Sequence, residues 1–75
     1  MKIYQVVRRG SEWHVLIPDA SSGVHCSLDK VAMIEWARDA ARRAAGEVQV
    51  RDVAGRIEVI YSYVTGVETQ NPAAS

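Results

Sequence analysis

One long helical pattern lies between two pairs of short β-type segments, and this order restricts the fold more than any other feature of the chain. The β-type segments are rich in β-branched and aromatic residues or alternate apolar with polar residues. They cover residues 3–7, 13–17, 47–51 and 56–64. The helical pattern covers residues 28–45. A short third strand is expected at residues 24–26. We therefore predict a two-layer α+β fold of order ββ(β)αββ, with one helix packed on an antiparallel sheet.

The ends of the predicted helix carry residues that often start and stop helices. Ser27 is a good N-cap, and Asp29 places negative charge in the first turn, where the helix dipole favours it. Gly46 follows the last apolar position and is expected to end the helix.

The helical and strand periods also predict which side chains form the core. Alternate residues of a strand point to opposite faces of the sheet, and one stripe of the helix is apolar. We expect nine residues to be buried between helix and sheet: Trp13, Val15, Trp36, Ala40, Val48, Val50, Ile57, Val59 and Tyr61.

The length of the chain, 75 residues, allows one domain. Residues 1–65 contain all the periodic segments and are predicted to form it. Residues 66–75 are polar, include Pro72 and show no apolar period, so we expect a disordered C-terminal tail.

Charge and cysteine content restrict the partners and the compartment. Lys plus Arg and Asp plus Glu each number 9, and this zero net charge disfavours a nucleic-acid or membrane-surface protein. With Cys26 alone, no disulfide can form within the chain, which indicates a reducing compartment. No segment has the pattern of a signal peptide or the length of an apolar membrane span. We expect a cytoplasmic protein.

Residues with catalytic or metal-binding chemistry are few. Ser27 and Lys30 match an S-x-x-K string, but the enzymes that use it need a larger scaffold and further motifs. His14, His25 and Cys26 are too few for a structural zinc site, and adjacent His25 and Cys26 would point to opposite faces of an extended segment. We expect no enzyme activity, no metal site and no cofactor.

Two sets of residues are candidate contact surfaces. The first consists of apolar residues outside the predicted core, which would suit a protein interface and a homodimer: Leu16, Ile60, Val31 and Ile34. The second consists of arginines that could contact nucleic-acid phosphates: Arg38, Arg42, Arg51 and Arg56. Glu35 and Asp39 are spaced to pair with the helical arginines, which favours a solvated charged face over a phosphate site.

The order of short motifs resembles a known bacterial family. The motifs are Val6-Val7-Arg8, Trp13-His14-Val15, Ala32, Ala37-Arg38, Gly55-Arg56-Ile57 and Ser62-Tyr63. Over about residues 4–66 they resemble the family called domain of unknown function 2188, although Leu28-Asp29-Lys30-Val31 and Trp36 depart from its usual pattern. The resemblance implies the ββαββ order and a bacterial protein, and it implies no established activity.

A second resemblance covers only about residues 4–45. Trp13 to Asp19, Gly23 and the helix are similar to the N-terminal half of HicB-type antitoxins, which bind a toxin ribonuclease and often DNA. It is an analogy of fold. The sequence thus favours a non-enzymatic protein–protein interaction module, with a nucleic-acid-binding or antitoxin-like regulatory domain as the alternative.

Overall fold

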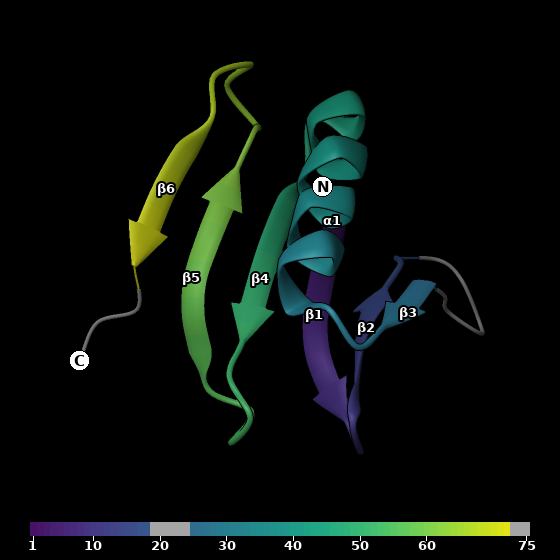
Figure 1. Cartoon of the computed structure of the whole chain (residues 1–75). Coiled ribbons are helices and arrows are strands. Elements are labelled where there is room, and N and C mark those ends of the chain that lie inside the picture. Colours follow the sequence, from purple (N-terminus) through teal and green to yellow (C-terminus); the bar gives the residue numbers. More distant parts are fainter. Residues whose placement is uncertain (19–24, 73–75) are drawn as a thin grey trace.

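The helix lies across one face of a six-stranded sheet (Figure 1). The computed structural model describes residues 1–18 and 25–72. Its elements are β1 (Ile3–Arg9), β2 (Glu12–Leu16), β3 (His25–Ser27), α1 (Lys30–Ala44), β4 (Glu47–Arg51), β5 (Ile57–Ser62) and β6 (Thr69–Pro72). The predicted two-layer α+β fold is confirmed. Within the described part of the chain, no helix is long and apolar enough to cross a membrane.

The sheet is mixed rather than antiparallel, which corrects one part of the prediction. The strand order is β3-β2-β1-β4-β5-β6, and β1 pairs with β4 in parallel while every other pair is antiparallel. The helix returns the chain to the end of the sheet where β1 starts, and the backbone N–H of Glu47 donates to the Lys2 carbonyl at 2.9 Å. Because β4 therefore starts beside the start of β1, the two strands run in the same direction.

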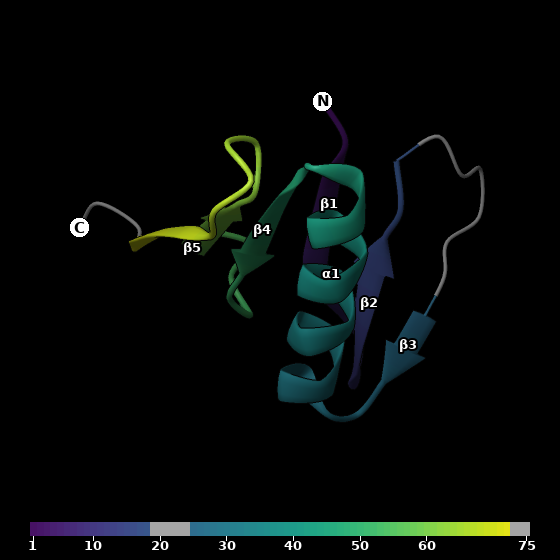
Figure 2. The same cartoon turned by 90° about the horizontal axis from the view of Figure 1, so that it is seen from above.

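The core lies mainly between α1 and strands β1 to β4 (Figure 2). Its buried residues are Tyr4, Val6, Trp13, Val15, Met33, Ala37, Ala41, Val48, Val50 and Tyr63. Four of the nine predicted core residues are among them. Trp36, Ala40, Val59 and Tyr61 are half-buried and pack against this cluster. The ninth, Ile57, lies outside it.

A β-bulge explains why the prediction for Ile57 is wrong. Val50 pairs with Val59, but the next residue, Arg51, pairs with Ile57. Glu58 is therefore the extra residue of a bulge, which breaks the two-residue period of β5. Ile57 shares the sheet face of Arg51, on the side opposite α1.

Both ends of the helix differ by a residue or two from the prediction. Asp29, not Ser27, is the N-cap, and its carboxylate accepts from the backbone N–H groups of Val31 and Ala32 at 3.0 and 3.3 Å. Ser27 instead accepts from the Asp29 N–H at 3.0 Å. At the other end, Ala45 takes up the left-handed conformation, with a φ of 52°. The residue that ends the helix thus precedes Gly46.

The sheet continues into the segment that was predicted to be a disordered tail. Residues Thr69–Pro72 form β6, whose partners on β5 run from Ser62 to Val59. The prediction failed here because a short polar strand has no apolar period to reveal it. Residues 73–75 lie outside the described residues.

The predicted third strand is present as β3. Its expected first residue, 24, lies outside the described residues.

Candidate interaction surface

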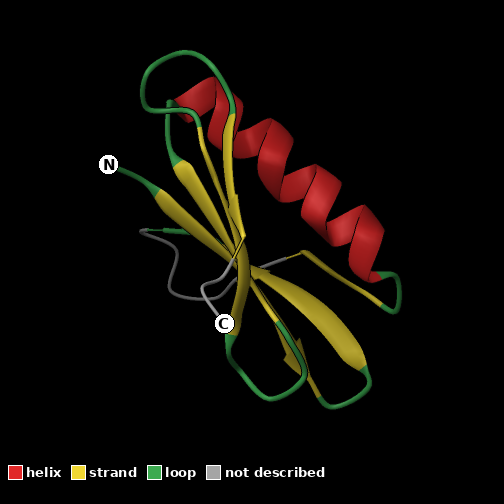
Figure 3. Ribbon diagram, turned by 90° about the vertical axis from the view of Figure 1, so that its left-hand side faces the viewer, coloured by secondary structure: helices red, strands yellow, loops and turns green. Residues whose placement is uncertain are grey.

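The sheet face opposite α1, here called the open face, is covered by no element in residues 1–18 and 25–72 (Figure 3). Register and alternation place eleven half-buried residues on it: Ile3, Gln5, Val7, His14, Leu16, Glu47, Gln49, Arg51, Ile57, Ile60 and Ser62. Five of them are aliphatic. The open face is therefore more apolar than a sheet face that only meets water.

One row of residues crosses the centre of the open face. Leu16 pairs with Gln5, Gln5 with Gln49, and Gln49 with Ile60. The predicted orientation of Leu16 and Ile60 away from the helix is confirmed. Two strands lie between them, so at about 4.8 Å per strand they are roughly 14 Å apart and do not touch.

Each end of this row has a second aliphatic neighbour. Val7 pairs with His14, which places it diagonally next to Leu16 within side-chain reach. On β5, the bulge places Ile57 beside Ile60 on the same face. The open face therefore carries two small aliphatic groups, separated by the amides of Gln5 and Gln49. The sequence pattern could not reveal the second group because the bulge inverts the face of Ile57.

The two charged residues of β4 lie on either side of the central row. Arg51 donates from Nε to the Gln5 side-chain oxygen at 3.3 Å and from Nη1 to the Gly55 carbonyl at 2.9 Å. Glu47, at the start of β4, lies between Ile3 and Ser62. One positive and one negative charge thus stand on opposite sides of Gln49.

The other two candidate interface residues, Val31 and Ile34, lie on α1 and so on the opposite side of the sheet. Val31 is 61% exposed, whereas Ile34 is half-buried and packs against the core. The four candidates therefore do not form one surface.

The four candidate phosphate-binding arginines are also divided between the two sides. Arg38 and Arg42 lie on α1, and Arg42 is 3.7 Å from Asp39 on the same helix. Arg51 lies on the open face, and Arg56 is exposed just before β5. The four arginines therefore do not form one continuous surface.

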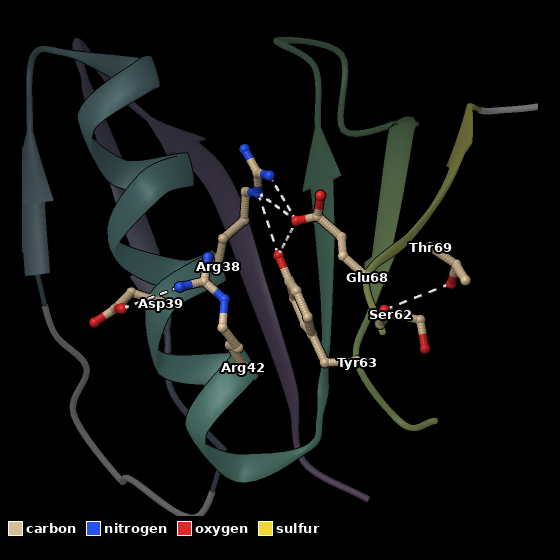
Figure 4. Close-up of polar contacts among 7 residues, drawn as sticks. All are labelled: Arg38, Asp39, Arg42, Ser62, Tyr63, Glu68 and Thr69. Carbon is tan, nitrogen blue, oxygen red and sulfur yellow. Dashed lines mark hydrogen bonds and ion pairs between the residues drawn. The ribbon is translucent and has the colours of Figure 1, made fainter. Parts of the chain in front are cut away.

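A polar cluster joins α1 to the segment between β5 and β6 (Figure 4). Arg38 Nε lies 3.1 Å from Glu68 Oε1 and 3.2 Å from the Tyr63 hydroxyl, and that hydroxyl also donates to Glu68. The Arg38 guanidinium stacks 4.5 Å from the centre of the Tyr61 ring. Arg38 and Glu68 are thirty positions apart, and no motif in the sequence links them.

The contacts of this cluster set its ionisation. Hydrogen bonds from Tyr63 and Arg38 stabilise the carboxylate and lower the pKa of Glu68. Burial, together with the bond to Glu68, raises the pKa of the Tyr63 hydroxyl, which is in a residue only 3% exposed. The hydrogen bonds that Arg38 makes with Tyr63 and Glu68 raise the pKa of its guanidinium group. A neutral phenol between the Arg38 guanidinium and the Glu68 carboxylate is suited to fixing β6 against the helix rather than to proton transfer.

Among the described residues, one group of three could hold a metal ion: Glu12, His14 and Cys26. His14 and Cys26 are cross-strand partners on the open face. His25 points the other way and lies 4.0 Å from Trp36, ring centre to ring centre. The predicted divergence of His25 and Cys26 is confirmed.

Comparison with known proteins gives one match. The profile of a family described as uncharacterised proteins conserved in bacteria, DUF2188, matches residues 4–63. No curated protein and no solved structure matches the chain. The resemblance to HicB-type antitoxins is not shown by these comparisons.

Proposed function

The chain belongs to the DUF2188 family of uncharacterised bacterial proteins, and we propose that it is a non-enzymatic interaction module that pairs with a second copy of itself through the open face. The observation that supports this most directly is the pair of aliphatic groups around Leu16 and Ile60, on a sheet face that no element of the described part of the chain covers. The proposal includes a cytoplasmic location, because Cys26 has no second cysteine within the chain to form a disulfide with.

The arrangement of the open face suits two-fold symmetry. A two-fold interface brings one patch against its own copy, so the patch must be complementary to itself. An axis along the central row would bring Leu16 against Leu16 and Ile60 against Ile60 of the second copy. Gln5 and Gln49 would likewise meet their own counterparts, and amide groups can donate and accept hydrogen bonds with one another.

The residues beside the central row are complementary under the same axis. That axis exchanges the two sides of the row, so Arg51 would face Glu47 of the second copy, and Val7 would face Ile3. This contact between Arg51 and Glu47 would occur twice in the dimer, once on each side of the axis. The zero net charge of the chain adds no long-range repulsion between the copies.

The alternative function, nucleic-acid binding, has weaker support. Its four arginines lie on both sides of the sheet, and two of them, Arg38 and Arg42, pair with carboxylates of their own chain. Phosphate binding also falls steeply with added salt, so salt-dependent retention on heparin would separate the two proposals.

Sedimentation across the micromolar range tests the dimer. The native chain should sediment at twice the monomer mass. Leu16→Glu or Ile60→Glu should yield monomers, because each substitution places a glutamate of one copy against the same glutamate of the other copy. Val31→Glu, on the exposed side of α1, is the matched control and should remain dimeric. A native chain that stays monomeric at every concentration would refute the proposal.

A charge exchange tests the proposed orientation. Arg51→Glu and Glu47→Arg should each weaken the dimer, since each places like charges opposite one another. The double variant should restore it, because every contact again joins a positive and a negative side chain. If the double variant is as monomeric as the single ones, the axis along the central row is wrong.

A further inference from the structure

Three side chains that commonly bind metals gather at one margin of the open face. Glu12 and His14 come from β2, and Cys26 comes from β3. Their ligand atoms, one oxygen, one nitrogen and one sulfur, all lie within 4.8 Å of one another. His14 Nε2 is 3.8 Å from Glu12 Oε1.

The strand register, rather than a flexible loop, brings these residues together. Glu12 and His14 are two positions apart on one strand and therefore share a face. Cys26 is the direct partner of His14 across the β2–β3 pair. The backbone thus fixes the three β-carbons on one side of two hydrogen-bonded strands, and only side-chain rotations remain to be set.

The observed spacing is close to what a bound ion requires. Zinc–nitrogen and zinc–oxygen bonds of about 2.0 Å and a zinc–sulfur bond of about 2.3 Å, in tetrahedral geometry, place neighbouring ligand atoms about 3.3–3.6 Å apart. The side chains would have to move together by about 1 Å. Glu12 and Cys26 are exposed and can make that rotation without disturbing the core.

We infer that Glu12, His14 and Cys26 form a binding site for a divalent transition-metal ion, with Zn²⁺ as the cation that this donor set fits best. A thiolate, an imidazole and a carboxylate are all zinc ligands, and the thiolate disfavours the hard cations Mg²⁺ and Ca²⁺. This inference replaces the expectation from the sequence, where only His14, His25 and Cys26 were considered together.

Three protein ligands leave one tetrahedral position for water or another small ligand. The site is therefore open, unlike a structural zinc site with four protein ligands. Binding requires the Cys26 thiol to lose its proton, so affinity should increase with pH. The inference does not depend on the proposed dimer, because all three ligands come from one chain.

Titration of the reduced, untagged chain with Co²⁺ alone tests the site, since cobalt takes the place of zinc and is coloured. We expect a saturable thiolate-to-cobalt charge-transfer band, with one ion bound per chain and displacement by Zn²⁺. Cys26→Ser should abolish the band, and His14→Gln or Glu12→Gln should weaken binding at least tenfold. Circular dichroism of each variant would show that the fold is retained.

His25→Gln is the matched control, because His25 adjoins Cys26 in sequence but lies on the helix side of the sheet. It should bind Co²⁺ as the native chain does, and so should Ile60→Glu, whether or not that variant dissociates a dimer. The inference is overturned by a native chain without the charge-transfer band or by a band that survives in Cys26→Ser. A stoichiometry of one ion per two chains would also overturn it.

Discussion

The α-carbon of Gly46 lies so close to the backbone carbonyl of Lys2 that a β-carbon at position 46 would overlap the Lys2 oxygen and lie 3.2 Å from its carbonyl carbon. That oxygen accepts from the Glu47 N–H, and the Gly46 carbonyl accepts from the Tyr63 N–H, each at 2.9 Å. The chain therefore passes between β1 and β5 at this point with no room for a side chain. Lack of space, not a left-handed φ, accounts for glycine at position 46.

Gly46→Ala should destabilise the protein by about 1–3 kcal/mol, the usual cost of forcing extra atoms into a packed site. Urea unfolding followed by circular dichroism measures this. Gly10→Ala is the complementary control, since Gly10 has a φ of 65° but open space around its α-carbon. The Gly10→Ala variant should keep the close contact between Gly46 and the Lys2 carbonyl. Its free energy of unfolding should fall by only about 1 kcal/mol, the strain of an alanine in the left-handed conformation. A Gly46→Ala variant as stable as the native chain would contradict the close contact.

Ala45→Gly should increase stability by about 0.5–1 kcal/mol. Ala45 ends α1 with a φ of 52°, where its β-carbon is strained, and glycine removes that strain at a smaller entropic cost. The denaturation midpoint should rise accordingly. Ala44→Gly, one residue earlier and inside the helix, should lower it by about 1 kcal/mol. A decrease in both variants would mean that the left-handed residue at 45 is not strained.

Alternation and helical spacing were enough to predict the helix, the first strands and the orientation of Leu16 and Ile60. These properties depend on each segment alone. The distance between Leu16 and Ile60 depends on strand order, which requires the parallel pairing of β1 with β4. That pairing arises from contacts near Lys2 and Glu47, and no local pattern encodes it.

The remaining failures also come from interactions between distant segments. The bulge at Glu58 reverses the face of Ile57, although the sequence of β5 alternates as if the strand were regular. Strand β6 is polar, and the cluster that anchors it joins Glu68 to Arg38, thirty positions away. The candidate metal site likewise needs the β2–β3 register, which places Cys26 opposite His14.

The two tryptophans should differ in their effect on stability. Trp13 is buried with 8% of its surface exposed, and the Lys30 ammonium lies 4.7 Å from its ring centre. Trp36 is half-buried, and its ring packs against that of His25 at an interplanar angle of 47°. Trp13→Ala should cost about 3–5 kcal/mol, enough to unfold a domain of this size, whereas Trp36→Ala should keep a cooperative transition. The reverse order, measured by urea unfolding, would contradict this burial pattern.

Replacing Glu68 should reduce stability in a pH-dependent way. Its hydrogen bonds lower the pKa of Glu68 in the folded state below the ordinary value of 4.5. A group whose pKa is lower in the folded state stabilises the fold above its unfolded pKa, and this contribution is lost as pH falls through the folded pKa. Glu68→Gln should therefore melt below the native chain at pH 7, and the difference should shrink as the pH falls below 4.5.

The comparison between native and variant chains isolates Glu68, because every other carboxylate is common to both. Thermal melts at a series of pH values from 7 to 2 would provide the measurement. Glu35→Gln removes an exposed carboxylate from α1 and leaves the Arg38–Tyr63–Glu68 cluster whole, so its melting temperature should stay close to that of the native chain throughout. A Glu68→Gln deficit that persists unchanged at the lowest pH would mean that the carboxylate charge is not what holds Glu68 to Arg38 and Tyr63.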